Sequence, residues 1–436
     1  MNQANATNVT AIAPGVQLCA IRAGRFKTSR LLLQLALPLR LGQPGVTAAN
    51  AALPFILHRS CAAYPRPRML ESRLAELYGA KLGAQVQKQG EAQVLTVALT
   101  AIDDRFALAG EAVAEGCAKL LLDLLFEPNL EDGLFPEQSV ALEKRLLLEQ
   151  LESEEGNKWQ FASNRMEALM CSQEAYGLNA KGEKDAVAAL TPQEITAAWK
   201  NALETAPIQF TLVADSDGQT VCEAIAARFA RQTRNPIKPE TEFIFAAGEE
   251  KFVREEQPIE QAKLFIGLRA GMADRRDKRF AMEVMTDLFG GGPYSKLFLN
   301  VREKLSLCYA VGARLNEQKG IMVVRAGVDT EKVPEAKAEI LRQLQLMRDG
   351  EFTGEELATS IRSFCDSICS GVDTPEYLAS WYGIYGMGMY EEEPISREDF
   401  CAHIEAVTRD EVIAAANGVT LDTIYLLASK EKEGEA

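Results

Sequence analysis

The residues best suited to chemistry lie in one stretch of the second half of the sequence. A run of three glycines, Gly290, Gly291 and Gly292, is followed by Arg302 and, seven residues later, Tyr309. An arginine presents a fork of N–H donors and a tyrosine presents a hydroxyl, so the pair could hydrogen-bond to an extended peptide. The alternative is that both are packing residues, a surface arginine and a half-buried tyrosine on a strand.

The glycine run predicts a tight turn. Three consecutive glycines lose too much backbone entropy to lie inside a helix. We therefore expect a turn between a helix at 280–289 and a second helix that begins near Pro293 and leads into a strand. A nucleotide-phosphate loop is excluded, because that loop follows a strand and ends in Gly-Lys-Ser/Thr, whereas this run follows a helix and ends in Tyr-Ser-Lys.

Composition narrows the classes of partner and compartment. The net charge of −15 argues against a nucleic-acid or anionic-membrane partner, because phosphate binding needs clustered lysine and arginine. The nine cysteines lack paired spacing, which indicates reduced thiols rather than a disulfide framework or a metal site. The N-terminus has no signal-peptide pattern, and no apolar run approaches the roughly 20 residues of a membrane span. We expect a cytoplasmic protein.

The elements that would position the chemistry recur in two halves. In the first half the pattern predicts strands at 15–21, 29–39, 83–88, 92–101 and 208–214, and helices at 48–61, 68–77, 106–125, 135–155 and 162–171. Thr191, Pro192 and Glu194 predict a capped helix start. The polar, proline-containing residues 231–242 predict a linker.

An internal repeat supports this division. Tyr78 and Gly90 are echoed by Tyr309 and Gly320, at offsets of 231 and 230 residues. The apolar strand at 31–37 likewise has a counterpart at 264–268. The sequence therefore predicts two similar α+β domains, residues 1–230 and 243–436. The position equivalent to Arg302 in the first half is Glu71, so only the second half has the Arg–Tyr pair.

The order Gly-Gly-Gly-x-x-Ser-x-Leu-Phe, Val-Arg-Glu-Lys and a later Tyr resembles the C-terminal signature of the M16 (pitrilysin or insulinase-like) metallopeptidases. The resemblance implies two homologous α+β domains, each a mostly antiparallel sheet packed with helices, closing around a substrate chamber. It also implies that Arg302 and Tyr309 hold substrate beside the turn formed by Gly290, Gly291 and Gly292.

Active members of that family carry His-x-x-Glu-His on a helix of the first half. The two histidines bind zinc and the glutamate activates water. The matching positions here are Pro54, Leu57 and His58, so one of three remains. Neither proline nor leucine can coordinate a metal or accept a proton. We expect no metal, no cofactor, no catalytic residue and no hydrolysis by this chain alone.

The remaining positions of the zinc site are also altered. The distant glutamate ligand of the family matches Gln150, and Glu149 would match only if the register slipped by one residue. Pro54 removes an amide donor, which predicts a kink or a helix start at that point. His403, the other histidine, is expected to be an ordinary helix residue.

Three segments, Leu-Pro-x-Ile-Leu in place of the zinc motif, Gly-Gly-Gly-Pro-Tyr-Ser-Lys-Leu-Phe and Glu-Lys-Leu-Ser-Leu-Cys-Tyr, resemble the Bacillus-type, non-peptidase M16 homologues. That resemblance implies a neighbouring M16 protein with the intact motif and an association with elongation factor P modification. Two functions stay open: the zinc-free subunit of a two-chain peptidase, or a non-proteolytic peptide-binding or scaffold protein like the bc1 core subunits. The expected partners are an intact M16 chain in a heterodimer, or a second copy in a homodimer, and a peptide or protein substrate. Retention of Arg302 and Tyr309 favours the first function.

Overall fold

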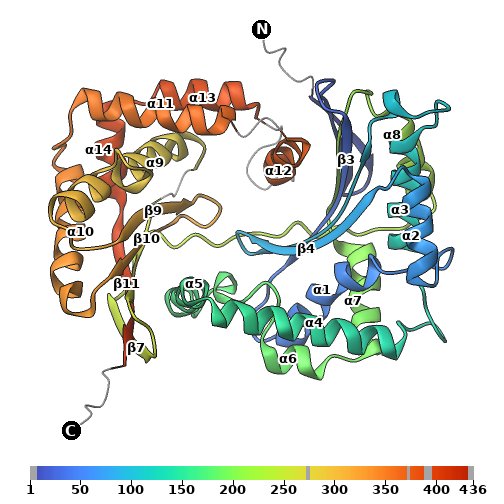
Figure 1. The fold of residues 1–436 in the computed structure, drawn as a ribbon, viewed down its shortest axis with the longest axis horizontal. Helices are drawn as coiled ribbons and strands as arrows, with labels where there is room; N and C mark the ends of the chain where they lie inside the picture. Colours follow the sequence, from blue (N-terminus) through green and yellow to red (C-terminus); the bar gives the residue numbers. More distant parts are fainter. Residues whose placement is uncertain (1–6, 272–274, 371–373, 387–394, 431–436) are drawn as a thin grey trace. The chain divides into compact units, whose positions relative to one another are not determined.

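A computed structural model describes residues 7–271, 275–370, 374–386 and 395–430. The chain divides into two compact units, each of which contains one β-sheet and its helices (Figure 1). Unit 1 comprises residues 1–152, 178–240 and 371–395. Unit 2 comprises residues 153–177, 241–370 and 396–436.

Unit 1 is built on a six-stranded sheet of order β1-β2-β6-β3-β5-β4. Its β2 and β6 are parallel, and the other neighbours are antiparallel. The strands are β1 (Thr7–Ala13), β2 (Val16–Arg22), β3 (Thr28–Pro38), β4 (Lys81–Gln89), β5 (Ala92–Ile102) and β6 (Ile208–Ala214). β3 lies between two neighbours and is buried along nearly its whole length, which explains its almost unbroken apolar sequence.

The helices of unit 1 cover this sheet. They are α1 (Pro44–Leu57), α2 (Pro67–Glu76), η1 (Asp104–Phe106), α3 (Val113–Phe126), most of α4 (Glu137–Gly156), α6 (Lys184–Ala189), α7 (Pro192–Thr205), α8 (Gln219–Phe229) and α12 (Pro375–Gly386). The capped start predicted for α7 is confirmed, since the Thr191 hydroxyl and the Glu194 carboxylate form a reciprocal capping box.

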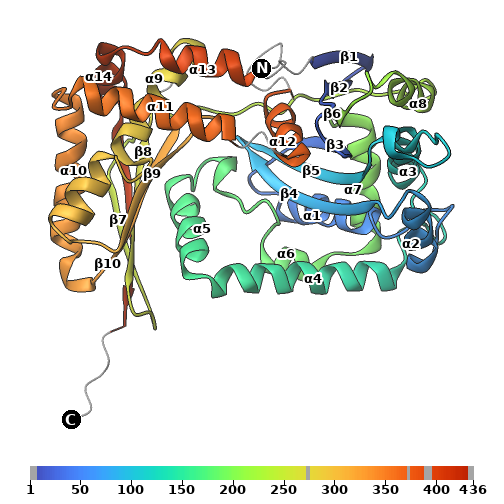
Figure 2. The same cartoon turned by 45° about the horizontal axis from the view of Figure 1, so that its top comes forward.

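The two faces of the unit 1 sheet differ in polarity. Leu31, Leu33 and Leu35 of β3 belong to the main hydrophobic core. Gln34 points to the other face, because side chains alternate along a strand. That face is covered by α12 (Figures 1 and 2). The Gln209 Nε2 of β6 donates to the Tyr382 carbonyl of α12 at 3.1 Å. The main core of unit 1 thus lies on one side of its sheet, and the other side combines buried glutamines with a smaller apolar cluster of Ala36, Ala92 and Val94.

Unit 2 has a five-stranded sheet of order β7-β11-β8-β10-β9. Its strands are β7 (Lys251–Gln257), β8 (Ala262–Arg269), β9 (Ala310–Asn316), β10 (Ile321–Val328) and β11 (Thr420–Ser429). The order corresponds to that of unit 1 without β1, and β7 pairs with β11 in parallel as β2 does with β6. The predicted match between 31–37 and 264–268 falls on β3 and β8, which have the same place in their sheets.

The helices of unit 2 include one from the first half of the sequence. They are α5 (Lys158–Met170), η2 (Ala175–Gly177), α9 (Arg275–Gly290), η3 (Phe298–Lys304), η4 (Thr330–Lys332), α10 (Val333–Arg348), α11 (Gly354–Ser370), α13 (Arg397–Glu405) and α14 (Arg409–Gly418). α5 packs on β8 and β11, and a Cβ at Gly267 would overlap Met166 and Met170. Glycine in β8 therefore permits the close approach of α5.

A buried charge network anchors the segment that follows α5. Arg269, 2% exposed, donates to both carboxylate oxygens of Glu174 at 3.0 and 2.7 Å and to Asp422 at 2.7 Å. Lys319 adds a 2.6 Å ion pair to Glu174. Two cations and two carboxylates thus neutralise one another. Removing any one of them would leave a buried charge without a partner, at a large desolvation cost.

The compact units are not contiguous in sequence, whereas the predicted domains 1–230 and 243–436 are. Residues 153–177 group with the second sheet, and residues 371–395 group with the first. The predicted linker 231–242 is also held in place. Arg234 donates to the carbonyls of Leu203 at 2.7 Å and Pro14 at 3.0 Å within unit 1.

Three local predictions need correction. Pro54 does not start α1 but lies inside it, in its last turn. The helix expected at 106–125 begins only at Val113, and residues 104–106 form a separate 3₁₀ turn. After the glycine run the chain turns as far as Ser295, and residues 298–304 then form a π-helix, which periodicity does not distinguish from an α-helix.

Within the described residues, no helix is long and apolar enough to span a bilayer.

Candidate functional site

The helix that matches the zinc motif, α1, is a continuous helix, but two of its motif positions have side chains that cannot bind a metal. Pro54 and Leu57 are both buried in α1, and Leu57 is 2% exposed within the apolar core. The His58 N–H donates to the Pro54 carbonyl at 3.2 Å, so the last turn of α1 continues past the proline. The two altered positions therefore serve core packing.

His58 caps the C-terminal end of α1. Its Nδ1 lies 2.6 Å from the Phe55 carbonyl oxygen and must donate, because a carbonyl can only accept. Burial lowers the pKa of His58, the Phe55 hydrogen bond opposes this, and the Arg59 cation lowers it further. The ring is accordingly neutral at pH 7, with one nitrogen engaged by the helix end.

Arg59, the residue after His58, forms an ion pair with Glu143 of α4. The Glu143 side chain is 2% exposed and the Arg59 side chain is 33% exposed. Burial raises the pKa of Glu143, and the Arg59 hydrogen bond opposes that rise. The buried carboxylate beside the former zinc motif is thus matched by a guanidinium of the same chain. Sequence reasoning missed this pair, although Arg59 directly follows His58 and Glu143 lies seven residues before Gln150.

The position of the fourth zinc ligand is unsuited to binding in either register. Gln150 is half-buried on α4 and has no charge to offer a metal. Glu149 is exposed and lies 3.6 Å from Arg145, one turn away on the same helix. Among the residues that the structure describes, no three His, Cys, Asp or Glu side chains are grouped so as to hold a metal ion.

A cleft of about 470 Å³ adjoins His58 in unit 1. Its lining comes from α2, β4 and the end of α1: His58, Arg59, Pro67, Leu70, Glu71, Leu74, Ala80, Lys81 and Leu82. Of the four positions of the zinc site only His58, the unaltered one, lines this cleft, together with Glu71, the counterpart predicted for Arg302. The cleft can hold polar groups but presents no nucleophile-activating base next to a metal ligand set.

The glycine turn of unit 2 has a packing explanation. A Cβ at Gly290 would lie 2.5 Å from the Ala313 nitrogen of β9, and one at Gly291 would lie 2.7 Å from the Asp287 Cα. A Cβ at Gly292 would lie 2.8 Å from the Tyr294 ring. Close approach to backbone atoms therefore requires glycine at Gly290 and Gly291, whereas at Gly292 the tyrosine side chain could move aside. The role of the three glycines in holding substrate remains a prediction.

Arg302 lies in η3 and reaches the surface. Its guanidinium lies over the Phe298 ring, 4.6 Å from the centroid. The Arg302 side chain is 41% exposed, and its nearest carboxylate is that of the adjacent Glu303 at 3.8 Å. Arg302 also lowers the pKa of the neighbouring Cys308 thiol, which burial raises to about 11.

Tyr309 lies directly before β9 and is 57% exposed. Its backbone N–H donates to the Gly327 carbonyl at 2.9 Å, which fixes the residue at the start of the edge strand. Its hydroxyl is 3.3 Å from Asp329. The predicted counterpart Tyr78 precedes β4 by three residues instead of one, and its hydroxyl donates to Glu111 at 2.8 Å. Arg302 on η3 and Tyr309 before β9 are thus both exposed side chains of unit 2, each with its own neighbours.

His403 lies on α13, as the sequence predicts, and stacks on the Phe280 ring, with 4.5 Å between the ring centroids.

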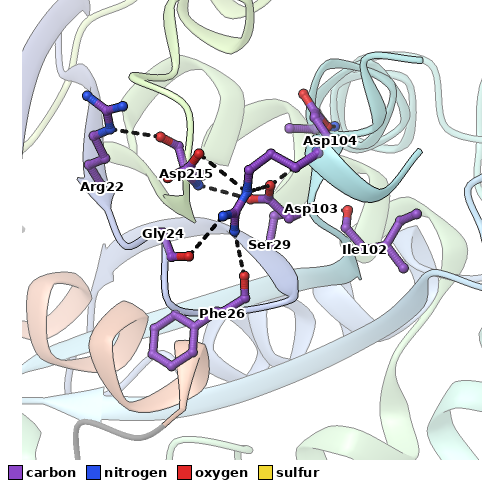
Figure 3. Close-up of polar contacts among 10 residues, drawn as sticks. Arg22, Gly24, Phe26, Ser29, Ile102, Asp103, Asp104 and Asp215 are labelled. Atoms are coloured by element: carbon purple, nitrogen blue, oxygen red, sulfur yellow. Dashed lines mark hydrogen bonds and ion pairs between the residues drawn. The ribbon is translucent and has the colours of Figure 1, made fainter. Parts of the chain in front are cut away.

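A polar cluster around Arg105, which sequence reasoning missed, lies at the strand ends of unit 1 (Figure 3). Arg105 donates to the carbonyls of Gly24 at 2.9 Å and Phe26 at 2.7 Å and to Asp103 at 2.7 Å. Every acceptor is a loop or strand-end group, so Arg105 fastens the loop between β2 and β3 and has no catalytic arrangement.

Comparison with known proteins agrees with this geometry. The model of the "Peptidase M16 inactive domain" matches residues 189–364. The chain is 30% identical to the "Probable inactive metalloprotease YmfF" of Bacillus subtilis, over 96% of each chain. A Streptomyces coelicolor protein described as an uncharacterized zinc protease is 25% identical over 66% of this chain and 64% of its own length.

Solved structures show the same fold. A conserved protein from Enterococcus faecalis superposes with a TM-score of 0.88 and 23% identity, covering 98% of this chain and 100% of that one. The peptidase M16 inactive domain from Pseudomonas fluorescens superposes with a TM-score of 0.79 and 18% identity. The match covers 98% of this chain and 99% of that one. The predicted α+β fold of two M16-type domains is therefore confirmed. The chain belongs to the M16 peptidase family, as an inactive metalloprotease-like member without the His-x-x-Glu-His motif.

Proposed function

We infer that this chain is the zinc-free subunit of a two-chain M16 peptidase and that Arg302 and Tyr309 hold its peptide substrate. One observation carries the proposal. Arg302 and Tyr309 are exposed and have only loose side-chain partners, whereas His58 and Glu143 are engaged inside their own unit.

The loose partners of the Arg–Tyr pair matter for binding. Glu303 lies 3.8 Å from Arg302, and Asp329 lies 3.3 Å from the Tyr309 hydroxyl. Exposed contacts of this kind contribute about 0–1 kcal/mol. Carbonyl groups of a peptide can therefore take over these donors at little cost, and the planar guanidinium fork suits two such acceptors.

The metal and the water-activating glutamate would come from a partner. We propose a heterodimer with an M16 chain that has the complete His-x-x-Glu-His motif, since a homodimer would contain neither group. Both chains would work in the cytoplasm. The similarity to the Bacillus-type homologues makes elongation factor P and its modification the first substrate class to test.

A second function is a non-proteolytic peptide-binding or scaffold protein. It is favoured by the glycine turn, because Gly290 and Gly291 are required by contacts with Ala313 and Asp287 and would be retained without any substrate. A scaffold would use the same surface but would depend less on Arg302.

The experiment is co-expression of this chain with an intact M16 chain from the same genome, followed by size-exclusion chromatography and peptide cleavage. We expect a one-to-one complex whose cleavage falls roughly ten- to a hundredfold for Arg302→Ala, because a lost charged hydrogen bond costs about 1.5–3 kcal/mol. Arg254→Ala is the matched control, since Arg254 is an exposed arginine of β7 paired with Glu256 at 2.8 Å. No complex, or equal activity of both variants, would favour the scaffold.

A further inference from the structure

Three cysteines meet between two helices of unit 2, although no two of them have the spacing of a sequence motif. Cys365 and Cys369 lie one turn apart on α11, and Cys401 lies on α13. The two helices pack against each other, side by side in both views (Figures 1 and 2). Positions four apart share one helix face, so both thiols of α11 can point toward α13.

The three cysteines lie close to one another where α11 packs on α13. The Cys365 Sγ lies 3.9 Å from the Cys401 carbonyl oxygen. Burial raises the pKa of the Cys401 thiol, and the neighbouring thiols of Cys365 and Cys369 raise it further. Cys365 and Cys401 are 8% and 7% exposed, whereas Cys369 is exposed to solvent. One accessible thiol therefore lies beside a buried one.

We propose that Cys369 and Cys401 form a reversible disulfide within one chain when the protein meets hydrogen peroxide. The Cys369 thiolate attacks one peroxide oxygen, the O–O bond breaks, and a sulfenic acid and hydroxide form. The Cys401 sulfur then attacks the Cys369 sulfur, the S–O bond breaks, and the hydroxyl leaves as water with the Cys401 proton. Two thiols are oxidised by two electrons, and one peroxide is reduced to two waters.

The environment sets the order of these steps. Burial is the main cause that raises the pKa values of Cys365 and Cys401, so both stay protonated and react slowly with an oxidant. The exposed Cys369 is therefore the first point of attack. Cys401 resolves the sulfenic acid because it already lies beside Cys369.

The place of this pair in the chain gives the disulfide a consequence. Cys369 lies near the end of α11, and Cys401 lies five residues into α13. Between them runs the segment 371–395, which carries α12 to the sheet of unit 1. A Cys369–Cys401 disulfide would close the residues between the two cysteines into a covalent loop that contains α12. Closing a loop of this length reduces the freedom of the unfolded chain, so oxidation should raise the stability of the folded chain.

The test uses the full chain, reduced and then treated with hydrogen peroxide. We expect two of the nine thiols to be lost, peptide mapping to identify a Cys369–Cys401 link, and the thermal midpoint to rise by roughly 5–10 °C. Dithiothreitol should reverse all three changes. Cys401→Ser should instead accumulate a sulfenic acid at Cys369 that dimedone traps.

Two variants serve as controls. Cys369→Ser should abolish the link and the thermal shift, and its exposed position makes the substitution compatible with folding. Cys222→Ser removes a half-exposed thiol of unit 1 and should leave both intact. A wild-type chain that forms a Cys365–Cys401 link, an intermolecular Cys369 disulfide or a sulfinic acid at Cys369 with Cys401 unmodified would overturn the proposal.

Discussion

The former zinc region of unit 1 and the Arg–Tyr segment of unit 2 each present an arginine next to a glutamate, with opposite consequences. Arg59 pairs with Glu143, whose side chain is 2% exposed, while Arg302 lies 3.8 Å from the 56%-exposed Glu303. The first arginine compensates a buried charge and the second does not. The first therefore belongs to the folded structure, and the second remains available to a ligand.

The difference shows how a catalytic centre can be lost while its surroundings stay folded. A buried carboxylate such as Glu143 needs a cation whether or not zinc is bound. Arg59 meets that need within the chain, so Pro54 and Leu57 can serve the core. No comparable structural demand fixes the side chains of Arg302 and Tyr309, which is why we assign them to binding.

The largest expected effect is on stability at the former zinc region. Arg59→Ala should lower the free energy of unfolding by about 2–4 kcal/mol, because it leaves Glu143 buried without a cation; the range is discounted because Arg59 is a third exposed. Arg302→Ala, the matched control, should change it by less than about 0.5 kcal/mol. Urea unfolding measures both. Equal losses in the two variants would remove the contrast between the regions.

The same variant has a pH signature. Burial raises the pKa of Glu143 in the folded state, and removal of Arg59 should raise it further. A raised carboxyl pKa favours folding below the unfolded pKa, and this contribution is lost as pH rises through the folded pKa. The deficit of Arg59→Ala should thus be largest near pH 7 and shrink on acidification toward the unfolded pKa. A deficit that grows on acidification would contradict the assignment to Glu143.

The glycine turn should show an intermediate effect on stability. Gly291→Ala places a Cβ against the backbone of Asp287, and overpacking of this kind typically costs about 1–3 kcal/mol. The neighbouring control is Gly354→Ala at the start of α11, where an added Cβ meets nothing within 4 Å. Thermal unfolding of the two variants compares them. If Gly291→Ala kept its stability and lost only peptide binding, the glycine turn would have a role in recognition and not in packing.

A smaller effect is expected at Tyr309. Tyr309→Phe removes one exposed hydroxyl, so peptide affinity of the two-chain complex should fall by about two- to tenfold, the result of one neutral hydrogen bond of about 0.5–1.5 kcal/mol. Its unfolding midpoint should not move, because the backbone contact to Gly327 remains. Tyr78→Phe is the control from unit 1. A larger loss for Tyr78→Phe would place peptide recognition in the other unit.

No effect at all is expected on zinc content. The purified chain should hold no stoichiometric zinc and cleave no peptide unaided, since Pro54, Leu57 and Gln150 offer no ligand set. His58→Ala should leave the zinc content unchanged and cost about 0.5–1.5 kcal/mol, because the hydrogen bond to the Phe55 carbonyl is lost. Elemental analysis after dialysis decides this. If the wild-type chain held one zinc and His58→Ala lost both the zinc and peptidase activity, the prediction that this chain has no metal site would be wrong.

Much of the architecture followed from the sequence. Alternating and continuous apolar runs located β2, β3, β5 and β6, because strand burial is a local pattern. Thr191 and Glu194 located the start of α7, since a capping box is made within one turn. The absence of ligands at Pro54 and Leu57 needed no coordinates either, because it follows from side-chain chemistry alone.

Other features depended on tertiary structure. Periodicity placed a helix near 162–171 but could not assign it to the second sheet, because the contact of Met166 with Gly267 joins residues about one hundred positions apart. The Arg59–Glu143 pair and the approach of Cys365 to Cys401 likewise join residues that share no local pattern. The sequence by itself determined which groups could not bind metal. Only the fold decided which charges are buried, since burial depends on packing between distant segments.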